Sequence, residues 1–408
     1  MAERSCVIIV ENLPVPMDRR VWQEALALKR AGWTVSVICP ATERYPLSYE
    51  ELDGIAIYRH PLPLEARGRF AFLFEYAAAL FHESRLLWKV WWQRGFQVIH
   101  ACNPPDLIFL VALPFKLLGK RFLFDHHDVC PELFEAKFNR KGLVHRVLLL
   151  AEKCTFIAAD LVVSANDTYR DIAIMRGGKR PDDVITVYSI PDKSRIHRVP
   201  ADVEARKGKT FVLGYVGVIG DQDGVDHLVL AVEHLIKNCG FSDFHAIVVG
   251  DGPALVSARQ LATDRGLDEF ITFTGYLSGE ALLRQLSTFD IGLMPDPVNA
   301  YNDKISMNKV FEYSALGIPS VAYPLTETRR LLGTAGVYAA GDTPAALADA
   351  CMELVEDDEL RDRSAREATR LAQRSFSWDR EANKLVAAYE RLVSPPAAPV
   401  ALRIGRKH

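Results

Sequence analysis

The chain has 408 residues, of which 49% are hydrophobic and 25% charged, and its formal net charge is -3 at pH 7. This composition is typical of a soluble globular protein, and the length predicts two domains rather than one hydrophobic core. The net charge is slightly negative, without the excess of basic residues that is typical of a nucleic-acid-binding protein. We therefore expect no nucleic-acid partner. The seven cysteines form no CxxC pair and show no repeated spacing. They indicate neither a zinc site nor a disulfide framework and favour a reducing, cytoplasmic setting.

No stretch predicts a membrane-spanning helix. The longest apolar run, at 107–115, contains Pro114 and is much shorter than the roughly 20 residues needed to cross a bilayer. The first residues lead directly into an apolar, strand-like run at 6–10, without the pattern of a signal peptide. We therefore expect a cytoplasmic protein.

The first half of the chain alternates between strand-like and helical patterns. Strand-like runs at 6–11 and 33–39 enclose a helical segment at 18–31, which is the pattern of a βαβ unit with parallel strands. Further buried strands are expected at 55–59, 98–100, 121–124, 161–164 and 184–187. The first half thus predicts one doubly wound α/β domain at 1–192.

The same alternation restarts after a polar, charged segment at 192–209, which we interpret as the linker. Strands are expected at 211–216, 245–249, 271–274, 290–294 and 320–323. A second doubly wound domain at 193–377 follows from this pattern. Such sheets bind ligands at the carboxyl ends of their strands.

The stretch Asn302–Pro319 has the pattern of a helix followed by a glycine stop and a strand. Lys309 and Glu312 lie three residues apart near the N-terminus of this helix, where unpaired N–H groups favour an anion. Lys309 would strengthen a phosphate site there, and Glu312 can accept two ribose hydroxyls. The implied ligand is a nucleotide with a diphosphate. The alternative is an ordinary amphipathic helix with a Lys–Glu pair on its surface.

The end of this stretch, Glu312–Pro319 (EYSALGIP), resembles the nucleotide-sugar-binding segment of retaining glycosyltransferases of the GT-B type, family 4. In that family a Glu-x7-Glu pair is followed by small residues, Gly, x and Pro. The resemblance implies two doubly wound, Rossmann-like domains facing a central cleft, and it gives Glu312 the ribose role. Lys304 stands where the family has its first Glu, so that role is not transferred. Lys304 and Asn308 remain candidates for donor binding.

In this family the last helix returns to the first domain, and the resemblance implies this for the helix expected at 378–393. The first domain would then bind the acceptor. The second would bind the nucleotide sugar.

A polar cluster, Asp-His-His-Asp, directly follows the strand expected at 121–124. The carboxyl end of a strand is where this fold binds its ligands. In the family that the chain resembles, the His before the Asp contacts the donor sugar, so the resemblance assigns His127 and Asp128 to catalysis. The alternatives are a metal site made by His126, His127 and Asp128, and a purely structural set of loop histidines.

Glycine-bearing turns follow the strands of the second domain. Gly217, Gly220 and Gly250 would let backbone N–H groups approach an anion, with a plain tight turn as the alternative. The resemblance assigns these glycines to the donor pocket and places Tyr276 near the nucleotide base.

The chain departs from the family at two positions of this pocket. The family commonly has an Arg and a Lys that serve the diphosphate, and this chain has Val218 and Asp223 there. Lys309 then remains, with Lys304 and helix N–H groups, to neutralise the leaving diphosphate. We therefore assign Lys309 to catalysis.

Asp18 and Arg19 open the first helix. The family has a glycine-rich loop before this helix, whereas the loop at 11–17 here contains no glycine. Asp18 and Arg19 are therefore assigned to acceptor binding through their side chains. The alternative is a helix capped by Asp18 with solvated arginines.

The stretch at 67–94 combines basic and aromatic residues. Such an amphipathic surface suits a membrane interface with anionic lipid, and it predicts peripheral membrane association. A core helix with a polar face and a dimer contact are the alternatives.

Together these features predict a bacterial, retaining glycosyltransferase that moves a sugar from a UDP-sugar to a hydroxyl of a lipid-linked or polysaccharide precursor. By resemblance the reaction needs no metal, and no cofactor is expected. A nucleotide-sugar 2-epimerase is one alternative. A non-catalytic partner with the same fold is another, because Lys304, Val218 and Asp223 depart from the family.

Overall fold

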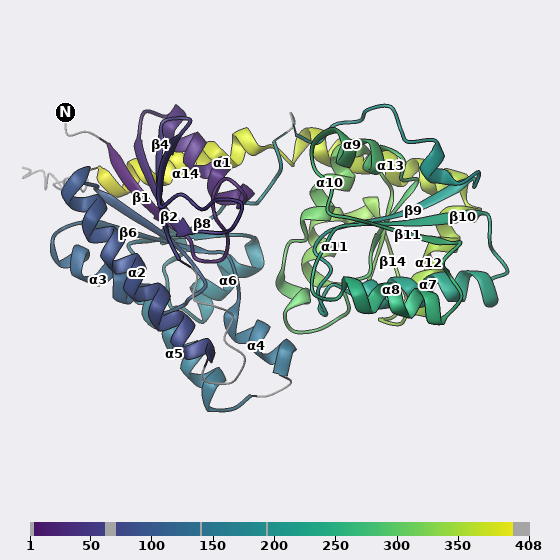
Figure 1. Ribbon diagram of the computed structural model, residues 1–408, viewed down its shortest axis with the longest axis horizontal. Helices are drawn as coiled ribbons and strands as arrows, with labels where there is room; N and C mark the ends of the chain where they lie inside the picture. Colours follow the sequence, from purple (N-terminus) through teal and green to yellow (C-terminus); the bar gives the residue numbers. More distant parts are fainter. Residues whose placement is uncertain (1–3, 62–70, 139–140, 193–194, 395–408) are drawn as a thin grey trace, which may run out of the picture. The chain divides into compact units, whose positions relative to one another are not determined.

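The computed structural model describes residues 4–61, 71–138, 141–192 and 195–394 (Figure 1). Among these residues, no helix is both long enough and apolar enough to span a membrane.

The chain divides into two compact units, each described by itself. The first consists of Met1–Asp125, Thr155–Val163 and Asn383–His408, and the second of His126–Cys154 and Ser164–Ala382. The domain boundary expected between residues 192 and 193 stays a prediction.

The first sheet has eight strands in the order β3-β4-β2-β1-β5-β6-β7-β8. Strand β1 (Ser5–Ile9) is buried at every position, as expected for a parallel strand covered on both faces. It runs parallel to β2 and β5, whereas β3, which the sequence did not predict, is antiparallel to β4. The remaining strands are β2 (Thr34–Pro40), β3 (Tyr49–Leu52), β4 (Ile55–His60), β5 (Val98–Cys102), β6 (Arg121–His126), β7 (Leu161–Ser164) and β8 (Val184–Thr186).

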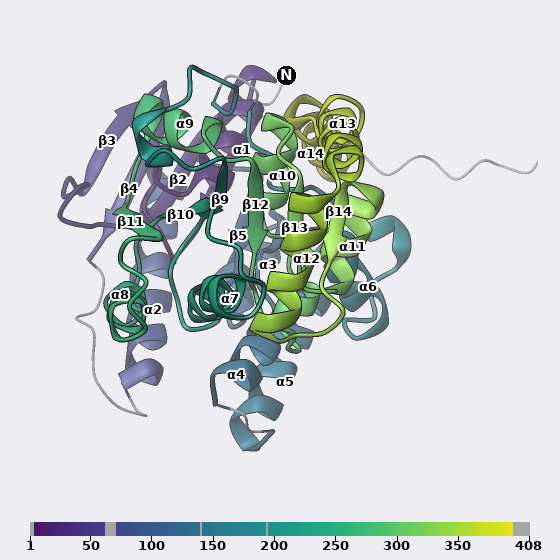
Figure 2. The ribbon, with the colours of Figure 1, turned by 90° about the vertical axis from the view of Figure 1, so that its right-hand side faces the viewer.

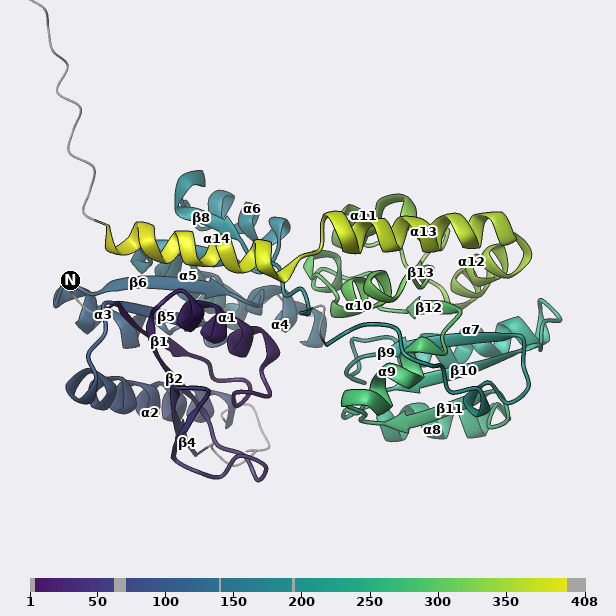
Figure 3. The same ribbon diagram turned by 90° about the horizontal axis from the view of Figure 1, so that it is seen from above.

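Helix α1 (Arg19–Arg30) begins where Asp18 accepts a hydrogen bond from the Val21 amide at 3.0 Å. It ends before Gly32, whose φ of +86° favours glycine. The apolar run at 107–115 is mostly the helix α3 (Phe109–Leu117), which contains Pro114 and contacts α2 (Figure 3). The other helices in this part of the chain are α2 (Ala71–Gln93), α4 (Cys130–Phe138), α5 (Leu143–Ala158), α6 (Asp167–Met175) and the 3-10 turn η1 (Pro181–Asp183).

The last helix, α14 (Trp378–Val393), belongs to the first unit from Asn383 onward. The hydroxyl of Tyr389 lies 2.7 Å from Nδ1 of His100, and the Tyr389 ring meets Trp33 edge to face at 5.0 Å. This part of α14 is therefore fixed to the core of the first unit by a buried aromatic side chain.

The second sheet lies in the second unit and has six parallel strands in the order β11-β10-β9-β12-β13-β14, seen side by side in Figure 2. The chain runs outward from β9 to β11 and then returns to the other side of β9 with β12. The direction of winding thus reverses between β9 and β12, which is where doubly wound sheets bind ligands. The strands are β9 (Phe211–Val216), β10 (Phe244–Val249), β11 (Ile271–Gly275), β12 (Ile291–Met294), β13 (Ser320–Ala322) and β14 (Gly336–Tyr338).

Helices cover both faces of the second sheet, with α7, α8 and α12 on one side and α9, α10 and α13 on the other (Figure 1). The predicted fold class is confirmed: two parallel-sheet, Rossmann-like arrangements. The helices of this unit are α7 (Val225–Lys237), α8 (Leu255–Asp264), α9 (Gly279–Ser287), α10 (Asn308–Leu316), α11 (Thr326–Leu332), α12 (Pro344–Glu356) and α13 (Asp358–Arg374), with 3-10 turns η2 (Glu204–Arg206), η3 (Asn302–Lys304) and η4 (Gly333–Ala335).

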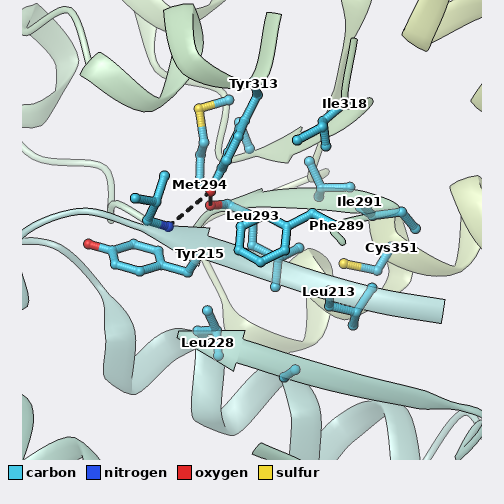
Figure 4. Packing of buried hydrophobic residues seen from close by; sticks show 14 of the residues in the cluster. Leu213, Tyr215, Leu228, Phe289, Ile291, Leu293, Met294, Tyr313, Ile318 and Cys351 are labelled. Carbon is cyan, nitrogen blue, oxygen red and sulfur yellow. Dashed lines mark hydrogen bonds between the residues drawn. The ribbon is translucent and has the colours of Figure 1, made fainter. Parts of the chain in front are cut away.

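Tyr313 fastens α10 to the reversal point of this sheet (Figure 4). Its hydroxyl accepts a hydrogen bond from the Val216 amide at 3.2 Å and lies 3.1 Å from the carbonyl oxygen of Gly214. Only glycine fits at position 214, because a Cβ there would lie 2.0 Å from the ring of Phe289. Since Lys309 is one turn before Tyr313, this contact also fixes the position of Lys309.

Candidate functional site

The candidate site lies in the second unit, at the carboxyl ends of β9 and β12. Gly217 (φ +157°) and Gly250 (φ +146°) bring the turns after β9 and β10 against each other. A Cβ at Gly250 would lie 1.8 Å from the carbonyl oxygen of Gly217, so any side chain there would force the turns apart. The structure thus brings two of the predicted glycines together, with no side chain between the two turns.

Lys309 stands in the first turn of α10 beside this edge. Its Nζ lies 2.7 Å and 2.8 Å from the two carboxylate oxygens of Asp296, two residues after β12. Both side chains are buried, and Nζ is 5.0 Å from the centre of the Tyr215 ring. Lys309 is therefore part of a buried ion pair. The alternative of a Lys–Glu pair on the surface of a helix is wrong.

Asp223 is the second carboxylate near Lys309. Its Oδ2 accepts a hydrogen bond from the Gly220 amide at 2.9 Å. Burial raises the pKa of this carboxyl above its ordinary value, the charge of Lys309 opposes the rise, and that of Asp296 adds to it. One ammonium group is thus surrounded by two carboxyl groups.

The other candidate residues on α10 and in the segment before it differ in burial and in hydrogen bonding. Glu312 is buried within α10, whereas Asn308, the first residue of the helix, is exposed. Helix α10 begins six residues later than Asn302, because residues 302–304 form the separate turn η3. Nζ of Lys304 donates to the carbonyl oxygen of Ala300 at 2.7 Å.

Tyr276 follows β11 and is 54% exposed. The carbonyl oxygen of Gly275, directly before it, accepts a hydrogen bond from the Gly250 amide at 3.0 Å. Tyr276 therefore lies next to the turn that carries Gly250. Its exposed side chain is available to a planar ligand.

The histidine cluster spans the end of β6, because the strand extends two residues beyond the expected 121–124 and includes Asp125 and His126, so that only His127 and Asp128 follow it. The carboxylate of Asp128 accepts a hydrogen bond from the Val129 amide at 2.9 Å and another from the Tyr301 hydroxyl. Burial raises the pKa of Asp128 to about 6, although these hydrogen bonds and the charge of His127 oppose the rise. The structure thus links Asp128 to Tyr301, just before η3. His127 is partly exposed.

His126 has structural neighbours. Its Nε2 lies 3.8 Å from a carboxylate oxygen of Glu152, and its ring lies 4.9 Å from that of Tyr169. Arg176 binds Glu152 at 2.5 Å and Glu132 at 2.7 Å. This buried group holds the start of the loop that carries His127.

The two acceptor-binding candidates, Asp18 and Arg19, lie in the first unit and differ in their contacts. Asp18 caps α1, and Arg19 beside it is exposed. Sequence reasoning passed over Arg20, which is buried and binds Asp125 at 2.9 Å and Glu24 at 3.1 Å.

His100 extends this buried group, with Nε2 3.1 Å from the carboxylate of Asp125. Burial and the charge of Asp125 raise the pKa of Glu24 well above its ordinary value, against the effect of Arg20. The four-residue spacing of Arg20 and Glu24 on one helical face was the signal available in the sequence.

Two family models match the chain. "Glycosyl transferase 4-like domain" matches residues 17–188 and "Glycosyl transferases group 1" matches residues 210–357. The chain belongs to the group 1 glycosyltransferases.

Curated relatives agree with this class. The chain is 26% identical to the alpha-D-kanosaminyltransferase of Streptomyces kanamyceticus over 48% of this chain and 55% of the relative. It is 30% identical to the D-inositol 3-phosphate glycosyltransferase of Corynebacterium efficiens over 44% of this chain and 42% of the relative. The matched part thus spans about half the length of these relatives.

Solved structures share the fold at low identity. Sucrose-phosphate synthase from Thermosynechococcus elongatus has a TM-score of 0.77 at 16% identity, covering 95% of this chain and 99% of the other. HepE from Anabaena, solved in complex with UDP, has a TM-score of 0.69 at 15% identity, covering 95% and 100%. A UDP-N-acetylglucosamine 2-epimerase from Listeria monocytogenes, described as putative, has a TM-score of 0.63 at 13% identity, covering 96% of each chain.

Proposed function

We propose that this enzyme transfers a sugar, with retention of anomeric configuration, from a UDP-sugar to a hydroxyl group of a lipid-linked or polysaccharide precursor in a bacterium. The observation that carries the donor assignment is the position of Lys309 and Glu312 on α10, at the reversal point of the second sheet. Doubly wound sheets bind nucleotides at this point. HepE, which has the same fold, was solved with UDP.

The diphosphate is assigned to the N-terminus of α10. No side chain caps this helix end, so its first N–H groups are available to phosphate oxygens. The Lys309 ammonium has three N–H donors, and it donates hydrogen bonds to the two carboxylate oxygens of Asp296. The third donor can therefore reach a phosphate oxygen while Asp296 holds the ammonium in place.

In this mechanism the bond between the anomeric carbon and the diphosphate oxygen breaks first. Lys309 and the α10 N–H groups stabilise the charge on the departing diphosphate. The acceptor hydroxyl oxygen then forms a bond to the anomeric carbon on the same face of the sugar and passes its proton to the departing diphosphate oxygen. We assign the ribose to Glu312, the base to Tyr276, and the donor sugar to His127 and Asp128. Gly217, Gly220 and Gly250 would line the donor, and Asp18 and Arg19 the acceptor.

The proposed reaction uses no metal ion and no cofactor, because the Lys309 ammonium and the α10 N–H groups would take the role of a cation. It also includes a cytoplasmic location with peripheral contact to the membrane, where a lipid-linked acceptor would lie.

Thermal unfolding with UDP, GDP and ADP tests the donor site in wild type and in Glu312→Ala. A ligand that binds only the folded protein raises its stability. We expect UDP to stabilise the wild type and to lose most of this effect in the variant. If no nucleotide changes the unfolding temperature of the wild type, the donor assignment is wrong.

Labelled UDP-sugar then distinguishes the reactions. Transfer requires an acceptor, whereas a 2-epimerase would change the sugar without one. Product formation only when acceptor is present supports transfer. Epimerised sugar without acceptor would support the alternative function.

A further inference from the structure

Helix α2 exposes a line of aromatic side chains to solvent. Phe81, Trp88 and Trp92 follow one another at intervals of seven and four residues, so they lie on the same side of the helix. Trp92 is 80% exposed and Phe81 65%. Two largely exposed aromatic rings on one helix face are costly for a protein surface.

Helix α3 adds a second apolar line. Leu110, Leu113 and Leu117, at intervals of three and four residues, are all exposed, and Leu117 is 83% exposed. In the sequence this segment is an apolar run too short to cross a bilayer. The structure shows that its leucines are on the outside of the first unit.

The two lines are neighbours. Trp88 of α2 packs against Phe115 of α3 with ring centres 4.6 Å apart, and Trp91 lies 5.9 Å from the same ring. Figures 1 and 3 show the two helices next to each other. The α2–α3 surface is defined here as Phe81, Trp88, Trp92, Leu110, Leu113 and Leu117. Exposed apolar side chains gathered on two adjacent helices in this way mark a contact site.

The exposed charged side chains that the structure describes on these two helices have one sign. Arg85 and Lys89 are exposed on α2 near the aromatic line, and Lys120 follows α3. Glu83 is the one acidic residue between Ala77 and Gln93, and it is buried, while α3 contains none. Within the described residues, both helices therefore present cations and apolar groups to solvent without an exposed carboxylate.

We infer that the α2–α3 surface docks on a lipid bilayer with anionic headgroups, an inference that rests on the proposed peripheral location. Tryptophan rings suit the boundary between headgroups and acyl chains, and leucine side chains enter the acyl region. Arg85, Lys89 and Lys120 then face lipid phosphates. The positive charge of the surface favours this partner over a neutral or basic one. The helices lie along the membrane and do not cross it.

Sedimentation with lipid vesicles tests the inference. We expect the full chain to bind vesicles of phosphatidylcholine and phosphatidylglycerol and to bind pure phosphatidylcholine more weakly, with binding that weakens as salt is added. The double variant Trp92→Ser, Leu117→Ser should bind at least about tenfold more weakly, because two large apolar side chains no longer enter the bilayer.

Val256→Ser is the matched control, because Val256 is 79% exposed on α8 of the second unit. This variant should bind vesicles like the wild type. Stabilisation by UDP should be unchanged in all three proteins, so a failed vesicle assay and a failed donor site are distinguishable.

Two results would overturn the inference. The first is vesicle binding that the double variant does not reduce. The second is an absence of vesicle binding together with a wild-type dimer, seen by sedimentation velocity, that becomes monomeric in the double variant. The second result would show that the α2–α3 surface joins two copies of the chain.

Discussion

The Lys309 ammonium lies 2.7 Å and 2.8 Å from the two carboxylate oxygens of Asp296, and both side chains are buried. The sequence suggested a cation free to meet a diphosphate. In the structure this cation already has a fixed partner. Lys309 is thus held in place before any ligand arrives. Part of its positive charge is already compensated by Asp296.

Asp296→Asn tests this relationship through stability. Removing one member of a buried ion pair leaves the other charge buried, which typically costs about 3–5 kcal/mol. We expect a loss of free energy of unfolding near the lower end, because Asp223 still faces Lys309. Urea denaturation at pH 7 measures it.

The double variant Asp296→Asn, Lys309→Gln provides the control. If the two side chains stabilise each other, the losses of the single variants will not add, and the double variant will be less destabilised than their sum. Additive losses would show that the pair contributes nothing by its mutual contact.

Glu312→Ala should weaken donor binding while leaving the fold intact. A hydrogen bond to a charged group contributes about 1.5–3 kcal/mol, so we expect the Kd of the UDP-sugar to rise by roughly tenfold to a hundredfold. Isothermal titration calorimetry measures this change. Glu353→Ala, at an exposed position of α12, is the control and should bind like the wild type. Equal affinities of all three proteins would remove Glu312 from the donor site.

His127→Ala should reduce turnover and leave UDP affinity unchanged, because His127 is assigned to the sugar and not to the nucleotide. Initial rates with labelled donor, together with UDP titration, separate these effects. His197→Ala, at an exposed histidine outside the assigned site, should match the wild type in both. A weaker UDP affinity in His127→Ala would place this residue at the nucleotide.

Asp128 should make stability depend on pH. Its pKa is about 6 in the folded protein and about 3.8 in the unfolded chain. Because the folded pKa is the higher one, the protonated carboxyl favours folding. This contribution is complete below about pH 4 and disappears as pH rises through 6.

Asp128→Asn cannot titrate, so the stability of the wild type relative to this variant should fall between pH 4 and pH 6 and then stay constant. Denaturant unfolding at pH 4, 5, 6 and 8 measures the difference. A difference that rises over this range would show that the carboxylate, and not the acid, is favoured by the fold.

Local sequence was sufficient for the class of this protein. The spacing of apolar residues predicted alternating strands and helices, because each element buries its own face in a regular period. Glu312–Pro319 carried the resemblance within eight successive residues. The tight turns at Gly217 and Gly250 were visible because glycine alone tolerates such backbone angles.

Other features depend on elements that are distant in the chain. Asp296 follows β12 and Lys309 lies in the first turn of α10, and no local pattern joins them. Their contact exists because β12 pairs with β9 and Tyr313 fastens α10 to the same strands. The α2–α3 surface likewise arises where Trp88 meets Phe115.

The sequence by itself determined the fold class, the group 1 glycosyltransferase family and the presence of Lys309 and Glu312 on one helix, since these follow from short-range periodicity and motif. Only the tertiary structure decided that the positive charge of Lys309 lies near the carboxyl groups of Asp296 and Asp223. Electrostatic interactions depend on distance in space and on burial, and both are fixed only when the strands of the sheet come together.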